Sequence, residues 1–139
     1  MTALLLLLIA AAGSPPERTV FACQIGDRTA TVLREGSNLI YRSERRGGVE
    51  LQLPDGRAAQ DSFSGGGELQ ATFRNGPWTY IVYERTIRTN FSGPNHPRYE
   101  AGIDVLRQSR VVSRRHCDDA DSQFSEQLAD VPTGMFIEH

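Results

Sequence analysis

A hairpin signal in residues 69–83, LQATFRNGPWTYIVY, decides the fold class of this chain. Apolar and polar residues alternate along 69–74, and large apolar residues dominate 78–83, with Asn75-Gly76 between the two runs. An Asn-Gly pair flanked by alternating hydrophobic residues is the strongest short-range signal for a β-hairpin. Residues 69–83 are therefore predicted to form two antiparallel strands.

The outgoing strand of this hairpin is apolar on both faces. Tyr80 and Val82 fall on one face, and Ile81 and Tyr83 fall on the other. Because successive side chains of a strand point to opposite faces, one of these pairs would lie in water if the strand were at the surface. The strand is expected to be central, or to have its outer face covered by another segment or a partner.

The period-two pattern recurs along the chain in short runs separated by glycine, asparagine and aspartate, which are typical of turns. The predicted strands are Val20–Gln24, Thr29–Arg34, Leu39–Ser43, Val49–Leu53, Leu69–Arg74, Trp78–Ile87, Gly102–Gln108 and Val111–His116. Residues Ala58–Glu68, which include three consecutive glycines, are predicted to form a loop. About eight short strands at this spacing indicate an all-β domain, a single antiparallel β-barrel or sandwich.

The pattern changes after the last predicted strand. An acidic stretch, 118–122, precedes Phe124 and Leu128, which are four residues apart. This combination predicts a short C-terminal helix with one face packed on the domain. The apolar residues of 131–137 are expected to plug one end of the barrel, and the alternative is a strand that binds a partner.

The chain begins with an apolar run, Leu4–Ala12, that is followed by Gly13 and by Pro15-Pro16. The run is about half of the ~20 residues that a membrane-spanning helix needs. We interpret residues 1–13 as a signal peptide and 14–139 as one β domain; the alternative is a buried N-terminal helix. The mature protein is then expected to be periplasmic or secreted, without a stable membrane anchor.

The chain has two cysteines, Cys23 and Cys117, and in an exported protein they are expected to form a disulfide. Closing a loop of this length would stabilise the fold by about 4 to 5 kcal/mol. In the alternative interpretation Cys117 is a reactive thiol activated by the basic residues 114–116, but the acidic pair 118–119 opposes that activation. No metal site is predicted, because the histidines and cysteines lack the spacing of zinc ligands.

Two loops contain the candidate binding residues. Ser64 and Gly65 belong to the glycine-rich loop, and the second loop runs from Arg88 to Tyr99. Long loops rich in groups that contact ligands are common binding sites, although a solvated crossover loop is the simpler alternative. The candidate binding residues are Ser64, Gly65, Arg88, Phe91, His96, Arg98 and Tyr99.

The composition and motifs favour binding over catalysis. A net charge of −2 gives no reason to expect a nucleic-acid partner. No nucleophile-elbow motif is present, and Glu84, Glu100 and Asp104 are interpreted as surface carboxylates. We therefore expect a non-catalytic binding protein with no cofactor. Its partner would be a small ligand or another periplasmic or extracellular protein, and the enzymatic alternative is a small hydrolase that uses the His96 loop.

Four features together resemble small uncharacterised exported proteins of Gram-negative bacteria. They are the aromatic-x-Cys motif at 21–23, the strand 78–82 after the Asn-Gly turn, the His96-Pro97 loop before 102–105, and the cysteine that ends the last strand. The resemblance spans residues 20–117. It implies a periplasmic β-protein and no particular activity.

The chain also resembles the periplasmic inhibitors of c-type lysozyme, in the aromatic-x-Cys motif and in the Ser-Gly-rich loop at 64–67. In that family the loop enters the cleft of the enzyme. The resemblance implies that Ser64 and Gly65 contact such a cleft. This chain departs from the family where the loop's second serine is replaced by Gly66 and where Leu69-Gln70 stands in place of the following aromatic residue.

Overall fold

A computed structural model describes residues 16–88, 93–94, 96–119 and 121–139. These residues form antiparallel strands and contain no helix, so the all-β class is confirmed. The strands are β1 (Arg18–Ile25), β2 (Arg28–Glu35), β3 (Asn38–Arg45), β4 (Gly48–Leu53), β5 (Arg57–Phe63), β6 (Gly66–Asn75), β7 (Trp78–Ile87), β8 (Arg98–Arg107) and β9 (Arg110–His116). A search of the same residues finds no helix with the length and apolar character needed to cross a membrane. The predicted signal peptide, residues 1–13, lies outside the described part of the chain.

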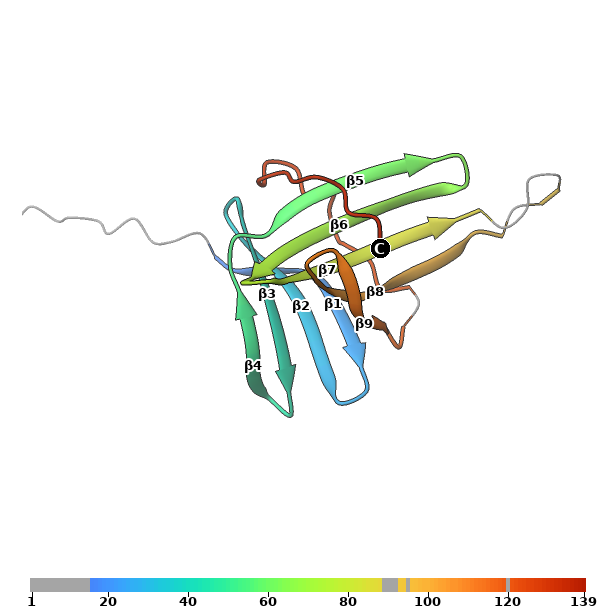
Figure 1. The fold of residues 1–139 in the computed structure, drawn as a ribbon. Helices are drawn as coiled ribbons and strands as arrows, with labels where there is room; N and C mark the ends of the chain where they lie inside the picture. The colour runs from blue at the N-terminus through green and yellow to red at the C-terminus, as the bar shows by residue number, and fades with distance from the viewer. Residues whose placement is uncertain (1–15, 89–92, 95, 120) are drawn as a thin grey trace, which may run out of the picture.

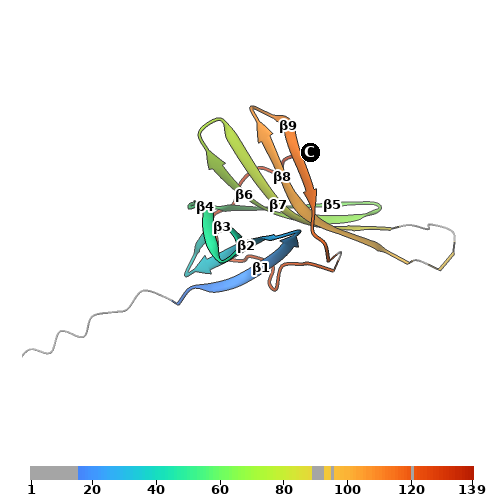
Figure 2. The ribbon, with the colours of Figure 1, turned by 90° about the horizontal axis from the view of Figure 1, so that it is seen from below.

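The strands form two sheets that pack face to face (Figure 1). Sheet A has the order β1-β2-β3-β4 and sheet B has the order β5-β6-β7-β8-β9, with every neighbouring pair antiparallel. The strands of sheet A run across those of sheet B, and the view from below in Figure 2 shows the two layers. The sheets do not close into a barrel. Of the two predicted architectures, the sandwich is therefore the one that forms.

The chain changes sheets at the corner formed by Pro54, Asp55 and Gly56. Pro54 has no N–H to continue the β4 ladder, and Asp55 has a positive φ of 60°. A Cβ at Gly56 would lie 2.4 Å from the Phe73 ring and 2.7 Å from Leu39. Only glycine therefore lets the corner pass this close to the core.

The hairpin of residues 69–83 forms as predicted and extends from Gly66 to Ile87, with its turn one residue later than expected. Asn75 pairs with Trp78, so the two loop residues are Gly76 and Pro77. Gly76 has a φ of 60°, and proline cannot adopt a positive φ. A type I′ turn needs a positive φ at both positions, so this turn has the glycine-first pattern of type II′.

The prediction of a loop at Ala58–Glu68 is wrong, because β5 and the start of β6 pair there from Arg57 with Thr72 to Phe63 with Gly66. Strand β5 is an edge strand of sheet B. Its contact with the core comes from Ala58, Ala59 is buried on the opposite face, and the remaining side chains are mostly polar and exposed. A short polar edge strand carries little of the apolar alternation from which strands are predicted.

The core lies between the two sheets. Sheet A contributes Phe21 and Val32, and sheet B contributes Phe73 and Val82, all nearly inaccessible to solvent. Full burial of such side chains stabilises the folded state by about 1.5–3 kcal/mol each. The segment after β9 completes the core: the Phe124 ring lies 4.7 Å from the Phe21 ring, and Leu128 is also buried.

The predicted C-terminal helix does not form. The N–H of Ser125 donates to the carbonyl of Val20 instead of to a helical partner, and Leu128 and Asp130 have positive φ values. The side chains of Phe124 and Leu128 both reach the core from an irregular segment. The two apolar side chains are therefore buried, as their spacing predicted, but the backbone that carries them is not helical.

Residues 131–139, which we call the C-terminal strap, cross the β5 edge and then lie on the outer face of sheet B (Figure 1). The Ala58 N–H donates to the Pro132 carbonyl at 2.9 Å, and the Gly134 N–H donates to the Ala58 carbonyl at 2.9 Å. Farther on, Ile137 packs against Ile81 and Tyr83 of β7. The prediction that the second face of β7 is covered is confirmed, whereas the predicted barrel plug has no barrel to close.

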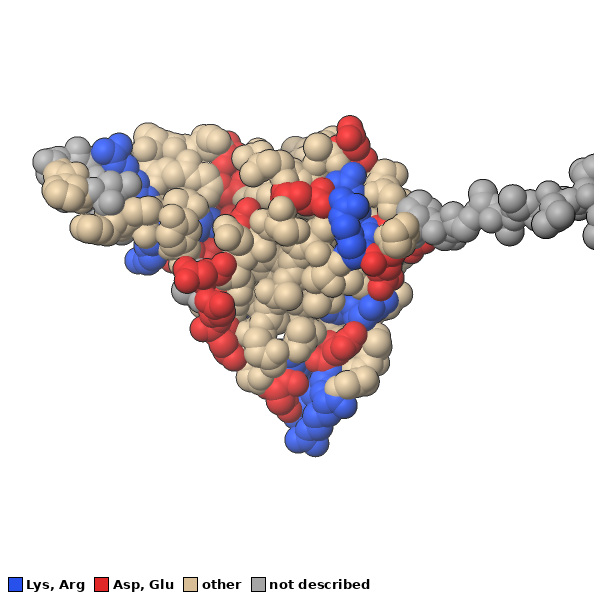
Figure 3. Space-filling view, turned by 180° about the vertical axis from the view of Figure 1, so that it is seen from behind, with Lys and Arg blue, Asp and Glu red and all other residues tan. Residues whose placement is uncertain are grey.

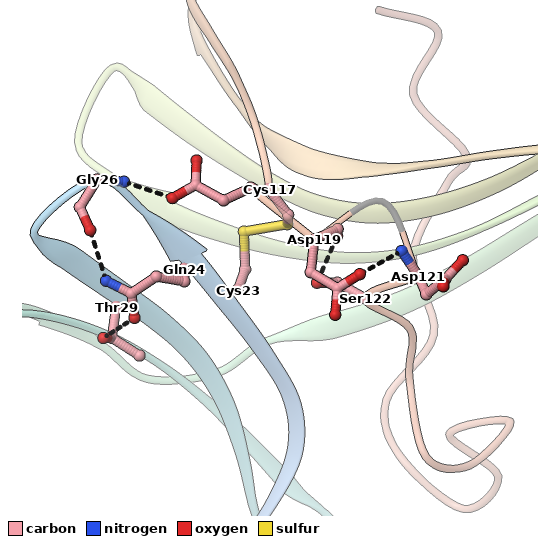
Figure 4. Close-up of a disulfide and its surroundings, with 9 residues drawn as sticks. Cys23, Gln24, Gly26, Thr29, Cys117, Asp119, Asp121 and Ser122 are labelled. Atoms are coloured by element: carbon pink, nitrogen blue, oxygen red, sulfur yellow. Dashed lines mark hydrogen bonds between the residues drawn. A yellow bond between two sulfur atoms is a disulfide. The ribbon is translucent and has the colours of Figure 1, made fainter.

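Cys23 and Cys117 form the predicted disulfide (Figure 4). Cys23 is on β1 of sheet A, and Cys117 directly follows β9 of sheet B. Beside the bridge, the Gly26 N–H donates to the Asp118 carboxylate at 2.9 Å. The disulfide therefore ties the two sheets together, and it is consistent with an oxidising compartment.

Candidate functional site

A cleft of about 460 Å³ opens between the two sheets. The floor of the cleft is aromatic, since the Tyr41 ring on β3 lies 5.6 Å from the Tyr80 ring on β7. The apolar side chains around these rings are Ile25, Leu51, Ile103 and Val105. Clefts of this size and apolar character are typical of small-molecule sites.

The strand register explains why these residues meet. On sheet A, Ala30 pairs with Ser43 and Ser43 with Leu51, which places the three side chains in one row on the inner face. On sheet B, Tyr80 pairs with Val105, which in turn pairs with Ser113. The two rows face each other across the cleft, where the sheets are not in full contact.

Tyr41 keeps its proton at any physiological pH. Burial raises the pKa of its hydroxyl to about 12, with the neighbouring Ser43 hydroxyl partly opposing the shift. A neutral phenol can both donate and accept a hydrogen bond. Tyr41 therefore adds a hydrogen-bonding hydroxyl group to an otherwise apolar floor.

The charged groups at the rim of the cleft leave an excess of positive charge. Arg28 is paired with Glu50, with 3.5 Å between Nε and Oε1. Arg115 shares a cross-strand row with Ile103 on β8, and no described residue forms an ion pair or hydrogen bond with its guanidinium group. Arg115 is therefore available to an anion at the cleft mouth.

A second, polar hollow of about 530 Å³ lies at the end of sheet B that extends beyond sheet A. Glu84 of β7 is half-buried there, and its Oε2 accepts the Phe124 N–H at 3.0 Å. Burial raises the pKa of Glu84 above its usual range, and the Phe124 N–H opposes this rise. The pairing of Glu84 with Ala101 and of Thr86 with Tyr99 brings Tyr99 to the same hollow.

A buried polar cluster lies under the C-terminal strap, on the outer face of sheet B. The His139 imidazole contacts two carboxylates, with Nδ1 2.5 Å from Asp104 and Nε2 3.0 Å from Glu68. Its side chain is 2 % exposed and packs 4.7 Å from the Tyr83 ring. Gln70 holds the adjacent strap backbone, because its amide donates to the Ile137 carbonyl at 2.7 Å and accepts the Ile137 N–H at 3.1 Å.

Burial alone would lower the pKa of His139, but Asp104 and Glu68 outweigh it and raise the pKa to about 9. The imidazole is therefore a cation at neutral pH. This charge compensates two carboxylates whose own pKa values are lowered below the usual range despite their burial. The cluster is closed to ligands by the strap, so its role is to anchor the strap.

No protein-family model matches this chain, and no curated protein or solved structure shows significant similarity to it.

Three of the candidate binding residues meet at one tip of sheet B. Ser64 and Gly65 form the β5–β6 turn, and the Arg88 N–H donates to the Gly65 carbonyl. The turn projects beyond sheet A beside the start of the β7–β8 loop (Figure 1). Ser64 is exposed, so this tip is open to solvent.

The remaining candidates do not form one site. Tyr99 lines the polar hollow, and Arg98 forms an exposed ion pair with Glu100 at 3.1 Å. His96 is exposed and lines neither of the two openings. Phe91 lies outside the described residues.

The interpretation of Glu84 and Asp104 as surface carboxylates is wrong, because Asp104 is fully buried and Glu84 is half-buried. Tyr41 and Arg115 were not predicted to be members of a cleft. Arg115 could have been found from the sequence, because the alternation of side chains places it on the inward face of an edge strand. Only the crossing of the two sheets could show what it faces.

Proposed function

We propose that this chain is an exported, non-catalytic binding protein whose inter-sheet cleft takes a small anion with an apolar or aromatic body. The observation that carries the proposal is the combination of the Tyr41–Tyr80 floor with the Arg115 guanidinium at the rim, which has no ion-pair partner among the described residues. An apolar body would be removed from water against the aromatic floor. The disulfide supports export, because such bonds persist in oxidising compartments.

The charge distribution supports an anion of small size. Arg28 is already neutralised by Glu50, so Arg115 supplies a single binding charge. On the face seen in Figure 3, acidic and basic side chains are interspersed along the margins and the middle is uncharged. A polyanion such as a nucleic acid binds through a continuous basic surface, and this face offers none.

The cleft residues supply recognition and no reaction. Serine, tyrosine and arginine side chains line it, and Glu50 is held by its ion pair with Arg28. The His139 imidazole, which could act as a general base, is enclosed under the strap on the outer face of sheet B. A proton acceptor must be within hydrogen-bond reach of the reacting group, and no described histidine lines the cleft.

The test is calorimetric titration of the oxidised protein with decanoate and with decanol, two probes that share an apolar chain and differ in charge. We expect saturable one-to-one binding of decanoate. The Arg115→Gln variant should weaken decanoate binding about tenfold, or about 1.4 kcal/mol, and leave decanol binding unchanged. Arg110→Gln is the matched control, because Arg110 is an exposed arginine on β9 outside the cleft.

A blocking pair of variants locates the binding. Ser113 lines the cleft, so Ser113→Trp should fill it and abolish binding of both probes. Val112 is 50 % exposed and does not line the cleft, so Val112→Trp adds the same bulk on the same strand without blocking it. Absence of saturable binding to the parent protein, or equal binding to the Ser113→Trp variant, would rule out the cleft as the ligand site.

A further inference from the structure

The polar hollow at the projecting end of sheet B has no part in the proposed function. It lies beyond the cover of sheet A, at the opposite end of β7 from the Tyr80 floor of the cleft. Its inner wall comes from β5–β8, and its opposite wall comes from residues 121–127. A volume of about 530 Å³ is within the range of about 300–1,000 Å³ found for small-molecule sites.

The polarity of the inner sheet face changes where sheet A ends. Along β7 the inner residues are Tyr80 and Val82 over the core, and then Glu84 and Thr86 in the hollow. The same face of β5 continues from Ala58 to Gln60. A surface that only had to cover the core would need no half-buried carboxylate here, because burying such a group is costly unless it has a partner.

Some of the hydrogen-bonding groups that line the hollow have no partner among the described residues. No described residue bonds the side-chain amides of Gln60 and Gln127, which both line the hollow. Glu84 uses one oxygen for the Phe124 N–H. The hollow therefore presents both donors and acceptors to an incoming molecule.

An aromatic ring stands at the edge of these polar groups. Tyr99 pairs with Thr86 in the row next to Glu84 and is 50 % exposed. On the other side of Thr86, its β6 partner is Gly67, which has no side chain to fill the space. An exposed ring beside unpaired amides and a carboxylate fits a ligand with both C–H surfaces and many hydroxyl groups.

The charge of the hollow argues against an anionic ligand. Glu84 and Asp121 line it, and the nearby Arg85 is already paired with Glu68 at 2.5 Å and with Glu100 at 3.3 Å. Among the described residues that line the hollow, an anion would meet carboxylates without a free cation to balance its charge. The ligand class that matches the donors, the acceptors and the ring is a neutral saccharide.

We propose that this hollow is a saccharide-binding subsite in which the Tyr99 ring stacks on a sugar face and Glu84, Gln60 and Gln127 bond its hydroxyl groups. The site is separate from the inter-sheet cleft in position and in ligand chemistry. One chain would then carry two recognition sites, an apolar one between the sheets and a polar one under the projecting hairpins.

The experiment titrates the full oxidised protein with three neutral trisaccharides, cellotriose, maltotriose and N,N′,N″-triacetylchitotriose, and follows binding by calorimetry and ligand-detected NMR. We expect saturable binding of at least one of them, with a Kd of about 1 mM or tighter. The Tyr99→Ala variant should weaken this binding about tenfold, and Tyr99→Phe, which keeps the ring, should retain it. The Glu84→Gln variant keeps an acceptor for the Phe124 N–H and should weaken binding by removing the charge.

Two controls separate the saccharide site from other effects. Val112→Ala removes an equally exposed apolar side chain outside the hollow and should leave saccharide binding unchanged. Ser113→Trp, which fills the inter-sheet cleft, should also leave it unchanged. The proposal is overturned if none of the three sugars binds saturably at 10 mM, or if Tyr99→Ala binds as tightly as the parent protein. Neither outcome bears on decanoate binding.

Discussion

At the scale of single residues, His139 shows how a buried charge is held in this protein. Glu68 on β6 and Asp104 on β8 are almost fully buried on the outer face of sheet B, where an unpaired carboxylate would be strongly destabilising. Arg85 and Arg114 each reach one carboxylate from the side, and His139 contacts both. One oxygen, Asp104 Oδ1, has no hydrogen-bond partner among the described residues.

This arrangement predicts a loss of stability at alkaline pH. The folded-state pKa of His139 is about 9 against 6.5 for an unperturbed histidine, so its stabilising charge is fully present below pH 6.5 and is lost as the pH rises through about 9. We expect the free energy of unfolding to fall by on the order of 2 kcal/mol between pH 6.5 and 9.5. Urea unfolding across this range measures it.

The matched variant is His139→Gln, which can still donate to a carboxylate and does not titrate. Its unfolding free energy should be lower than that of the parent protein at pH 6.5 and nearly independent of pH up to 9.5. Tyr83 beside the imidazole does not interfere, since burial raises its pKa to about 12. An equal slope in the parent and the variant would assign the pH dependence to another group.

At the scale of elements, the β5–β6 hairpin depends on one of its three consecutive glycines. Gly66 has a φ of 150°, and a Cβ there would lie 1.7 Å from the Thr86 carbonyl oxygen of β7. At Gly67 the nearest atom to such a Cβ is the Asp61 carbonyl oxygen at 3.3 Å. Position 66 must therefore be glycine, whereas position 67 has almost enough space for an alanine side chain.

We therefore expect Gly66→Ala to destabilise the fold by about 3 kcal/mol, because it combines backbone strain with a clash against the neighbouring strand. Gly67→Ala should cost less than about 1 kcal/mol. Thermal unfolding of both variants beside the parent protein gives the comparison. Similar melting temperatures for the two variants would contradict the structural difference between the two sites.

At the scale of the whole molecule, the two sheets are separate meanders that the chain joins through a corner at 54–56. Three further connections hold them together: the shared core, the segment after β9 that returns to β1, and the disulfide. The bridge spans 94 residues, from Cys23 to Cys117. It closes nearly the entire described domain into one loop.

Removing this bridge should lower the free energy of unfolding by about 4 to 5 kcal/mol, the value expected for a loop of about 100 residues when chain entropy dominates. The Cys23→Ala/Cys117→Ala double variant tests this by its urea midpoint. Addition of a reductant should lower the midpoint of the parent protein and leave that of the double variant unchanged. A loss below about 1 kcal/mol would show that the core alone holds the sheets together.

Most strands were predictable because they alternate apolar and polar residues and end at turn-forming pairs. The hairpin around Gly76 and the covered second face of β7 followed from residues 69–83 alone. Strand β5 was not predictable in this way, because its polar residues do not show the apolar alternation of a strand. Its pairing with β6 stabilises it instead. The spacing of Phe124 and Leu128 suggested a helix, yet their burial is achieved from an irregular backbone.

The sequence by itself determined most of the strands and turns and the pairing of the two cysteines, because alternation and turn chemistry act over a few residues and two cysteines allow one intramolecular bridge. Only the tertiary structure decided for a sandwich over a barrel, and only it placed Tyr41 opposite Tyr80 and His139 between Glu68 and Asp104. These contacts join residues far apart in the chain, and they depend on how the sheets cross and where the strap lies. The local periodicity of the sequence carries no information about the crossing of the sheets or the position of the strap.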